Sequence, residues 1–245
     1  MGMSINTNLS ALNTYRNLNA THNDLSKSLE KLSSGLRINR AADDAAGLSI
    51  SEGLKSQVGG LTVAARNAQD GISVVQTAEG GLTETHSILQ RMRDLAVQAG
   101  NDSNNEDSRK AITTEVGELT KELTRISQST NFNGINLLDG SAGAEGVMKF
   151  QVGANGDEAS QIEVNLSGAN VATIAGNLAD LSFTDAAGAQ DAIDTIDAQI
   201  TSVSTARSNL GAIQNRFDHA INVTNVAKEN LTAASSRITD VDMAE

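Results

Sequence analysis

The sequence predicts a mainly α-helical protein, an elongated antiparallel coiled-coil helical bundle with a small β-hairpin insert. Three observations predict this fold class. The 245 residues contain no proline, although average usage of about 5% would give roughly a dozen, and this favours long uninterrupted helices. Apolar residues recur at the spacing of a coiled-coil seam over most of the chain. Aromatic residues make up only 2% of the chain, so the core must consist of smaller aliphatic side chains that let helices pack closely.

The first predicted helix covers the region from Ile5 to Leu36, and Gly35 stands where it should end. Its apolar residues form a narrow stripe, which is typical of a coiled-coil helix and not of a helix in a globular core. Residues 1–60 carry six basic and five acidic groups, a net charge of +1. This segment can therefore associate with neighbours without strong repulsion.

A long second helix is predicted over residues 44–99, because a mainly apolar rhythm runs from Leu48 to Ala99. The glycine pairs Gly59-Gly60 and Gly80-Gly81 either permit close approach of a neighbour or mark bends. Asp43 and Asp44 suit its start, where free backbone amides favour carboxylates. As one helix this segment would measure about 84 Å. A polar turn at 101–107 follows, and the spacing of the next apolar residues predicts a third helix of about 25 residues.

The middle of the chain has a different character. Asn133-Gly134 is a strong turn signal, and residues 147–152 and 162–166 alternate like the two strands of a hairpin. The rest of 141–188 is rich in Gly, Ala, Asn and Asp, and we expect a short surface insert. The heptad rhythm returns at Ile193 and continues to the end. We therefore expect the chain to be organised in four segments, with the bounds 1–43, 44–140, 141–188 and 189–245.

Composition excludes several classes of protein. Without cysteine there is no disulfide framework, thiol nucleophile or thiolate metal site. No apolar run reaches the about 18 residues of a membrane span, and no cleavable signal peptide is recognisable at the amino terminus. The net charge of −12 disfavours nucleic acid as a partner.

The sequence contains no recognisable constellation of catalytic residues. The histidines are spread through the chain at His22, His86 and His219, and none has a histidine or an acidic residue four positions on. The sequence contains no metalloprotease, nucleophile-elbow, phosphate-loop or dinucleotide-binding motif. We expect neither an enzyme nor a bound cofactor or metal.

One surface group in the second helix suggests a binding role. The spacing places Arg91, Asp94, Leu95 and Gln98 on one face of the helix. Because Met92 and Ala96 carry the seam, Leu95 is expected to lie partly outside it. A partly exposed leucine beside an arginine resembles a partner-binding spot, and an acidic stripe on the third helix that includes Glu115 could lie alongside. The alternative, a solvated face with ion pairs inside the helix, stays open at this point.

Six motifs, in order along the chain, closely resemble bacterial flagellin. They are 3–8 (MSINTN), 32–39 (LSSGLRIN), 41–48 (AADDAAGL), 89–98 (LQRMRDLAVQ), 131–134 (NFNG) and 237–245 (RITDVDMAE). The resemblance implies a subunit of the flagellar filament, with other flagellin subunits and a flagellar export chaperone as partners. It also implies type III export without signal cleavage and an extracellular location.

The family's architecture gives each segment an expected role. Residues 1–43 would form the filament core, 44–140 and 189–245 the rod, and 141–188 a short variable insert that faces outward. The apolar stripe of the first helix becomes a self-assembly stripe. Its members are Ile5, Leu9, Leu12, Leu25, Leu29 and Leu32.

The resemblance also favours the binding interpretation of the surface group, because the flagellin rod carries a patch read by the vertebrate innate receptor Toll-like receptor 5. The matching positions are Gln90, Arg91, Asp94, Leu95 and Glu115. Asp94 stands where a glutamate is common in the family, and its side chain has a shorter reach.

Three alternatives accompany this hypothesis. A flagellin usually continues past Glu245 with a helix that partners the first one. Without that helix we expect poor polymerisation of the chain alone and a frayed segment at 3–40, because an isolated helix is marginally stable in water. A truncated monomeric coiled-coil receptor ligand is therefore one alternative, and a hook-filament junction protein, which shares the terminal helices, is another. A flagellin with a metallopeptidase insert is the third, but the insert here contains no histidine.

Overall fold

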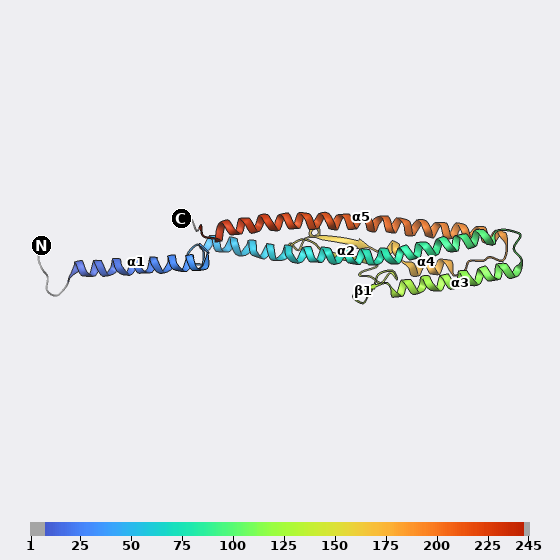
Figure 1. The fold of residues 1–245 in the computed structure, drawn as a ribbon, viewed down its shortest axis with the longest axis horizontal. Coiled ribbons are helices and arrows are strands. Elements are labelled where there is room, and N and C mark those ends of the chain that lie inside the picture. The colour runs from blue at the N-terminus through green and yellow to red at the C-terminus, as the bar shows by residue number, and fades with distance from the viewer. Residues whose placement is uncertain (1–7, 243–245) are drawn as a thin grey trace. The chain divides into compact units, whose positions relative to one another are not determined.

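The computed structural model describes residues 8–242 (Figure 1). The chain forms two compact units. Unit 1 consists of residues 1–59 and 226–245, and unit 2 of residues 60–225. The helices are α1 (Leu9–Ser34), α2 (Ala45–Ala99), α3 (Glu106–Ser129), α4 (Val171–Leu178) and α5 (Ala186–Thr239). The strands are β1 (Asn131–Phe132), β2 (Ile135–Asn136), β3 (Val147–Gln151) and β4 (Gln161–Asn165), with short 3-10 turns at Glu158–Ser160 and Ser167–Ala169.

This element order confirms the mainly α-helical fold class with a small β insert. The long second helix is a single element of 55 residues, as the mainly apolar rhythm predicts. The third helix has 24 residues, and the side chain of Asn105 caps it by accepting a hydrogen bond from the Ser108 amide. Within the described part of the chain, none of the helices has the length and apolar character needed to cross a membrane.

In unit 2, α2 and α5 run antiparallel. Three contacts show this. Gly71 faces Phe217, Glu79 pairs with Arg207 at 3.7 Å, and Arg93 pairs with Asp197 at 2.6 Å. The residue number of the partner on α5 falls as the residue number on α2 rises. The core between the helices consists mainly of aliphatic side chains. Its fully buried members include Leu82, Leu89, Met92, Leu123, Ile196 and Leu210.

The predicted turn and hairpin are both present. Asn133 and Gly134 have φ of 50° and 79°, and they connect β1 to β2, which pair antiparallel. Positive φ at both central residues is the requirement of a type I′ turn. Strands β3 and β4 pair antiparallel from Val147↔Asn165 to Gln151↔Gln161, so the hairpin prediction is confirmed.

The expectation that the rest of the insert lies on the surface is wrong. Leu166 and Val171 are fully buried, and Leu178 and Phe183 are each only 1% exposed. The reason is that Val171, Ile174, Ala175 and Leu178 have helical spacing, which gives α4 one apolar face that packs against α3. This segment therefore completes the core of unit 2.

In unit 1, α1 is capped at both ends but buries none of its residues. The Asn8 side chain accepts a hydrogen bond from the Ala11 amide, and Gly35 ends the helix with φ of 70°, a conformation that glycine adopts without steric cost. The loop to α2 is held by Asp43, whose carboxylate accepts the amides of Asn39 and Arg40. These backbone hydrogen bonds lower the pKa of Asp43.

Candidate functional site

The surface group of the second helix spans α2 and α3. Arg91 on α2 donates from Nε and Nη2 to Oε1 of Glu115 on α3, at 2.9 and 2.7 Å. Gln90 and Asp94 are exposed beside this pair, and Gln90 Nε2 lies 3.0 Å from His86 Nε2. The structure thus brings four of the five candidate residues together on one accessible surface, which we call the α2–α3 patch: Gln90, Arg91, Asp94 and Glu115.

Leu95, the fifth candidate, is buried, and the expectation that it is partly exposed is wrong. Only 3% of the residue is accessible, and it belongs to the hydrophobic core of unit 2. A two-helix seam would leave Leu95 at its edge, but α2 packs against α5 on one side and meets α3 on another. Its buried face is therefore wider than a coiled-coil seam.

The neighbouring arginine, Arg93, has a different partner. It holds Asp197 on α5 through a two-pronged contact, Nε to Oδ1 at 2.6 Å and Nη2 to Oδ2 at 3.2 Å. The hydrogen bond from this guanidinium lowers the pKa of Asp197. Arg93 thus fastens α2 to α5 while Arg91 fastens α2 to α3. Sequence reasoning missed Asp197, since a polar residue beside a heptad stripe carries no signal of its partner.

The self-assembly stripe of α1 is exposed throughout its described length. Its members are accessible to the following extents: Leu9 72%, Leu12 56%, Leu25 58%, Leu29 57% and Leu32 58%. Tyr15 at 66% and Leu18 at 63% extend the same stripe. Ile5, the remaining candidate, lies outside the described residues. Exposed apolar side chains in a contiguous row usually mark an interaction surface.

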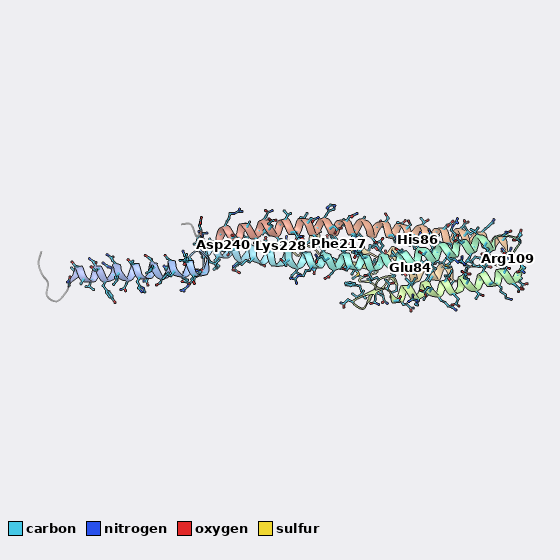
Figure 2. All side chains as sticks on the ribbon, in the orientation of Figure 1. Glu84, His86, Arg109, Phe217, Lys228 and Asp240 are labelled. Carbon is cyan, nitrogen blue, oxygen red and sulfur yellow. The ribbon has the colours of Figure 1, made fainter. Side chains whose placement is uncertain are left out.

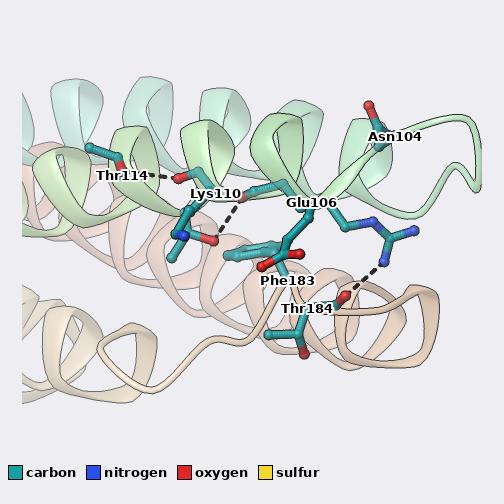
Figure 3. Close-up of a pocket in the computed structure, with 8 residues that line it drawn as sticks. Asn104, Glu106, Lys110, Thr114, Phe183 and Thr184 are labelled. Atoms are coloured by element: carbon teal, nitrogen blue, oxygen red, sulfur yellow. Dashed lines mark hydrogen bonds between the residues drawn. The ribbon is translucent and has the colours of Figure 1, made fainter.

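A pocket of about 670 Å³ lies between the start of α3 and residues 183–184 (Figure 3). Arg109 lines it and donates to the Thr184 carbonyl oxygen at 3.2 Å, a contact that holds α3 to the segment that precedes α5. Thr114 bonds to the Lys110 carbonyl within α3. Within residues 8–242, no cluster of three or more histidine, cysteine or acidic side chains is placed to bind a metal ion.

The fold and its surfaces define a mainly helical structural protein that leaves a long apolar stripe exposed. Comparison with known proteins gives the family. Residues 5–143 match the family model of the bacterial flagellin N-terminal helical region, and residues 193–245 match that of the bacterial flagellin C-terminal helical region. The chain belongs to the bacterial flagellin family. It is therefore a structural subunit of the flagellar filament and not an enzyme.

Individual relatives agree with this assignment. A flagellin of Halalkalibacterium halodurans is 51% identical over 243 residues, which cover 99% of this chain and 88% of the relative. A flagellin of Bacillus subtilis is 45% identical over 270 residues, covering 99% of this chain and 89% of the relative. The crystal structure of Bacillus cereus flagellin superimposes with a TM-score of 0.55 at 31% identity, covering 64% of this chain and 88% of that one.

Proposed function

We propose that the exposed stripe of α1 is the surface through which this subunit joins its neighbours in the filament. The observation that carries the proposal is that seven large apolar or aromatic side chains of α1 are each at least 56% exposed, while the helix buries none of its residues. Fully burying one leucine contributes about 1.5–3 kcal/mol. Covering the whole stripe would supply several times that amount.

The charge of α1 suits association. Residues 9–34 contain three basic side chains (Arg16, Lys27 and Lys31) and two acidic ones (Asp24 and Glu30), a net charge of +1. The whole chain carries −12, so α1 lacks the repulsion that the rest of the protein would experience against a copy of itself. A helix of this kind gains most of its stability from packing against a partner.

Leu25→Asp tests this proposal. A charge in the stripe removes one buried leucine and adds an ion that must stay hydrated, so assembly should need a protein concentration at least about tenfold higher. The measurement is the amount of protein pelleted by high-speed centrifugation over a concentration series, in sulfate, which strengthens apolar burial.

The matched control is Asn23→Asp, which adds one negative charge on the opposite face of α1 and should pellet like the parent. Equal pelleting of the parent, Leu25→Asp and Asn23→Asp would show that the stripe takes no part in assembly. Circular dichroism of the three proteins checks that α1 has the same helix content in each.

The proposal includes the organisation and the location expected for the family. Residues 1–43 serve as the filament-core segment, 44–140 and 189–245 as the rod, and 141–188 as the short variable insert. Export proceeds through the flagellar type III apparatus with the help of an export chaperone, and the assembled protein is extracellular. Membership of the flagellin family supports these assignments.

A second function, recognition by Toll-like receptor 5, is favoured by the geometry of Arg91. Its pair with Glu115 places a cation and a carboxylate side by side on an accessible surface, with Gln90 and Asp94 next to them. A protein partner can engage these groups without any change in the fold of unit 2. In this proposal the receptor contacts the α2–α3 patch and not Leu95, because Leu95 is buried.

Arg91→Ala should weaken receptor signalling at least about tenfold, the loss typical of an arginine at the centre of an interface. Folding stability should change by less than about 1 kcal/mol, because the Arg91–Glu115 pair is exposed. The measurement is the half-maximal concentration in a receptor reporter assay. Arg125→Ala is the control, since Arg125 pairs with Glu122 on its own helix and is also exposed. Equal potency of the two variants would exclude the patch.

A further inference from the structure

The end of α1 and the end of α5 are joined by backbone hydrogen bonds within unit 1. The amide of Arg37 donates to the Thr239 carbonyl oxygen at 2.7 Å, and the amide of Val241 donates to the Gly35 carbonyl oxygen at 3.0 Å. Leu36 and Asp240 form the antiparallel bridge between these two bonds. We call this contact between residues 35–37 and 238–241 the clasp. Figure 2 labels Asp240 at the end of α5.

The Arg37 side chain reinforces the clasp. Its Nε and Nη2 both donate to the carbonyl oxygen of Ile238, at 3.2 and 2.7 Å. Ile238 lies in the last turn of α5, where backbone carbonyls lack a helical partner. A cation at this position satisfies such a carbonyl and also interacts favourably with the negative end of the helix dipole.

The rest of the loop is tied to α1. Arg40 reaches back to Glu30 of α1 with Nε and Nη2 at 3.0 and 2.9 Å from Oε1. Asp43 accepts hydrogen bonds from the amides of Asn39 and Arg40, and Ile38, in the same loop, is only 4% exposed. The loop is therefore fixed to α1 at one end, and Arg37 provides the side-chain link from it to α5.

We infer that Arg37 is a positioning residue, which holds α1 in place through the clasp and makes this placement depend on the folded last turn of α5. Arg37 and Ile238 are 201 residues apart in sequence, so the clasp that holds α1 forms only when both regions have folded. A subunit with an unfolded α5 end would carry a loose α1. Any effect of a loose α1 on assembly rests on the proposed role of the α1 stripe. The existence of the clasp does not depend on that proposal.

The test measures the clasp in the unassembled 245-residue chain by amide hydrogen exchange. Arg37→Ala should speed exchange of the Val241 amide about tenfold, the effect expected when a hydrogen bond from a charged donor is lost. Exchange of the Leu210 amide, in the core of unit 2, should not change. Arg37→Lys should be intermediate, because an ammonium retains the charge but not the two-pronged donor.

The single tyrosine gives a second readout. Tyr15 lies on α1, and the chain has no tryptophan, so the fluorescence anisotropy of the protein reports the motion of α1. Arg37→Ala should lower this anisotropy. Arg16→Ala should not, since the hydrogen bond of Arg16 among residues 8–242 is to Asn13 on its own helix. Val241→Pro, which removes the backbone donor from residue 241 to the Gly35 carbonyl oxygen, should also lower the anisotropy.

The outcomes separate the clasp from the assembly proposal. Unchanged Val241 exchange and unchanged Tyr15 anisotropy in Arg37→Ala would overturn the inference, whatever the pelleting assay shows. Equally, fast exchange of the Val241 amide in Arg37→Ala with a normal core would support it even if Leu25→Asp assembles like the parent. If Arg37→Ala does not fold, Arg37→Lys decides the question by the same two measurements, because it keeps the Val241 amide.

Discussion

Replacing Phe217 by alanine should lower the free energy of unfolding by about 3–5 kcal/mol, the usual cost of removing a fully buried phenylalanine. Phe217 is 0% exposed on α5; it is labelled in Figure 2. Its ring fills a notch in α2 that Gly71 leaves open, because a Cβ at position 71 would lie 2.5 Å from Phe217 Cζ. The ring also meets Phe150 of β3 edge to face, with centroids 5.6 Å apart at 88°. One side chain thus joins α2, α5 and the hairpin.

Urea unfolding followed by circular dichroism measures this loss. Val223→Ala is the control on the same helix, because Val223 is 68% exposed and its truncation should change stability by less than about 0.5 kcal/mol. A double-mutant cycle with Phe150→Ala should give a coupling of about 0.5–1.5 kcal/mol for the ring pair. Similar stabilities of Phe217→Ala and Val223→Ala would show that the three elements do not depend on this ring.

The long helices could be predicted from sequence because their signal is repeated many times. The mainly apolar rhythm of α2 recurs along a helix of 55 residues that contains no proline. The Asn133-Gly134 turn was equally predictable, since its positive φ values restrict the residues that can occupy it. The α4 segment was not recognised. Its eight residues give only two turns of period, and the glycine and asparagine around it are typical of loops.

In the candidate site, too, features set by local spacing could be predicted and features set by tertiary packing could not. Local spacing groups Arg91, Asp94, Leu95 and Gln98 on one face of α2, and all of these except Leu95 are exposed. Gln90 is a candidate only through the family resemblance. The partners of the arginines depend on tertiary packing, however, and Asp197 lies 104 residues from Arg93. The burial of Leu95 also depends on packing, because a heptad pattern describes contact with one neighbouring helix. It does not show that α3 will cover the adjacent face of α2 as well.

Leu95→Ala should therefore act on folding, with a loss of about 2–5 kcal/mol in the free energy of unfolding. The side chain is 3% exposed and belongs to the core that α2, α3 and α5 share. The proposed receptor contact through Arg91 should behave in the opposite way, with a large loss of signalling and little change in stability. Urea unfolding and the receptor reporter assay, applied to both variants, distinguish the two roles.

Val97→Ala completes the comparison, because Val97 is two residues from Leu95 on α2 but is 52% exposed. Its stability should stay within about 0.5 kcal/mol of the parent. If Leu95→Ala is as stable as Val97→Ala and yet signals poorly, Leu95 is a direct receptor contact and its side chain contributes little to the core. If Leu95→Ala loses stability as expected, its signalling must be measured at a temperature where the variant remains folded, because only a loss of signal measured there reflects receptor contact and not unfolding.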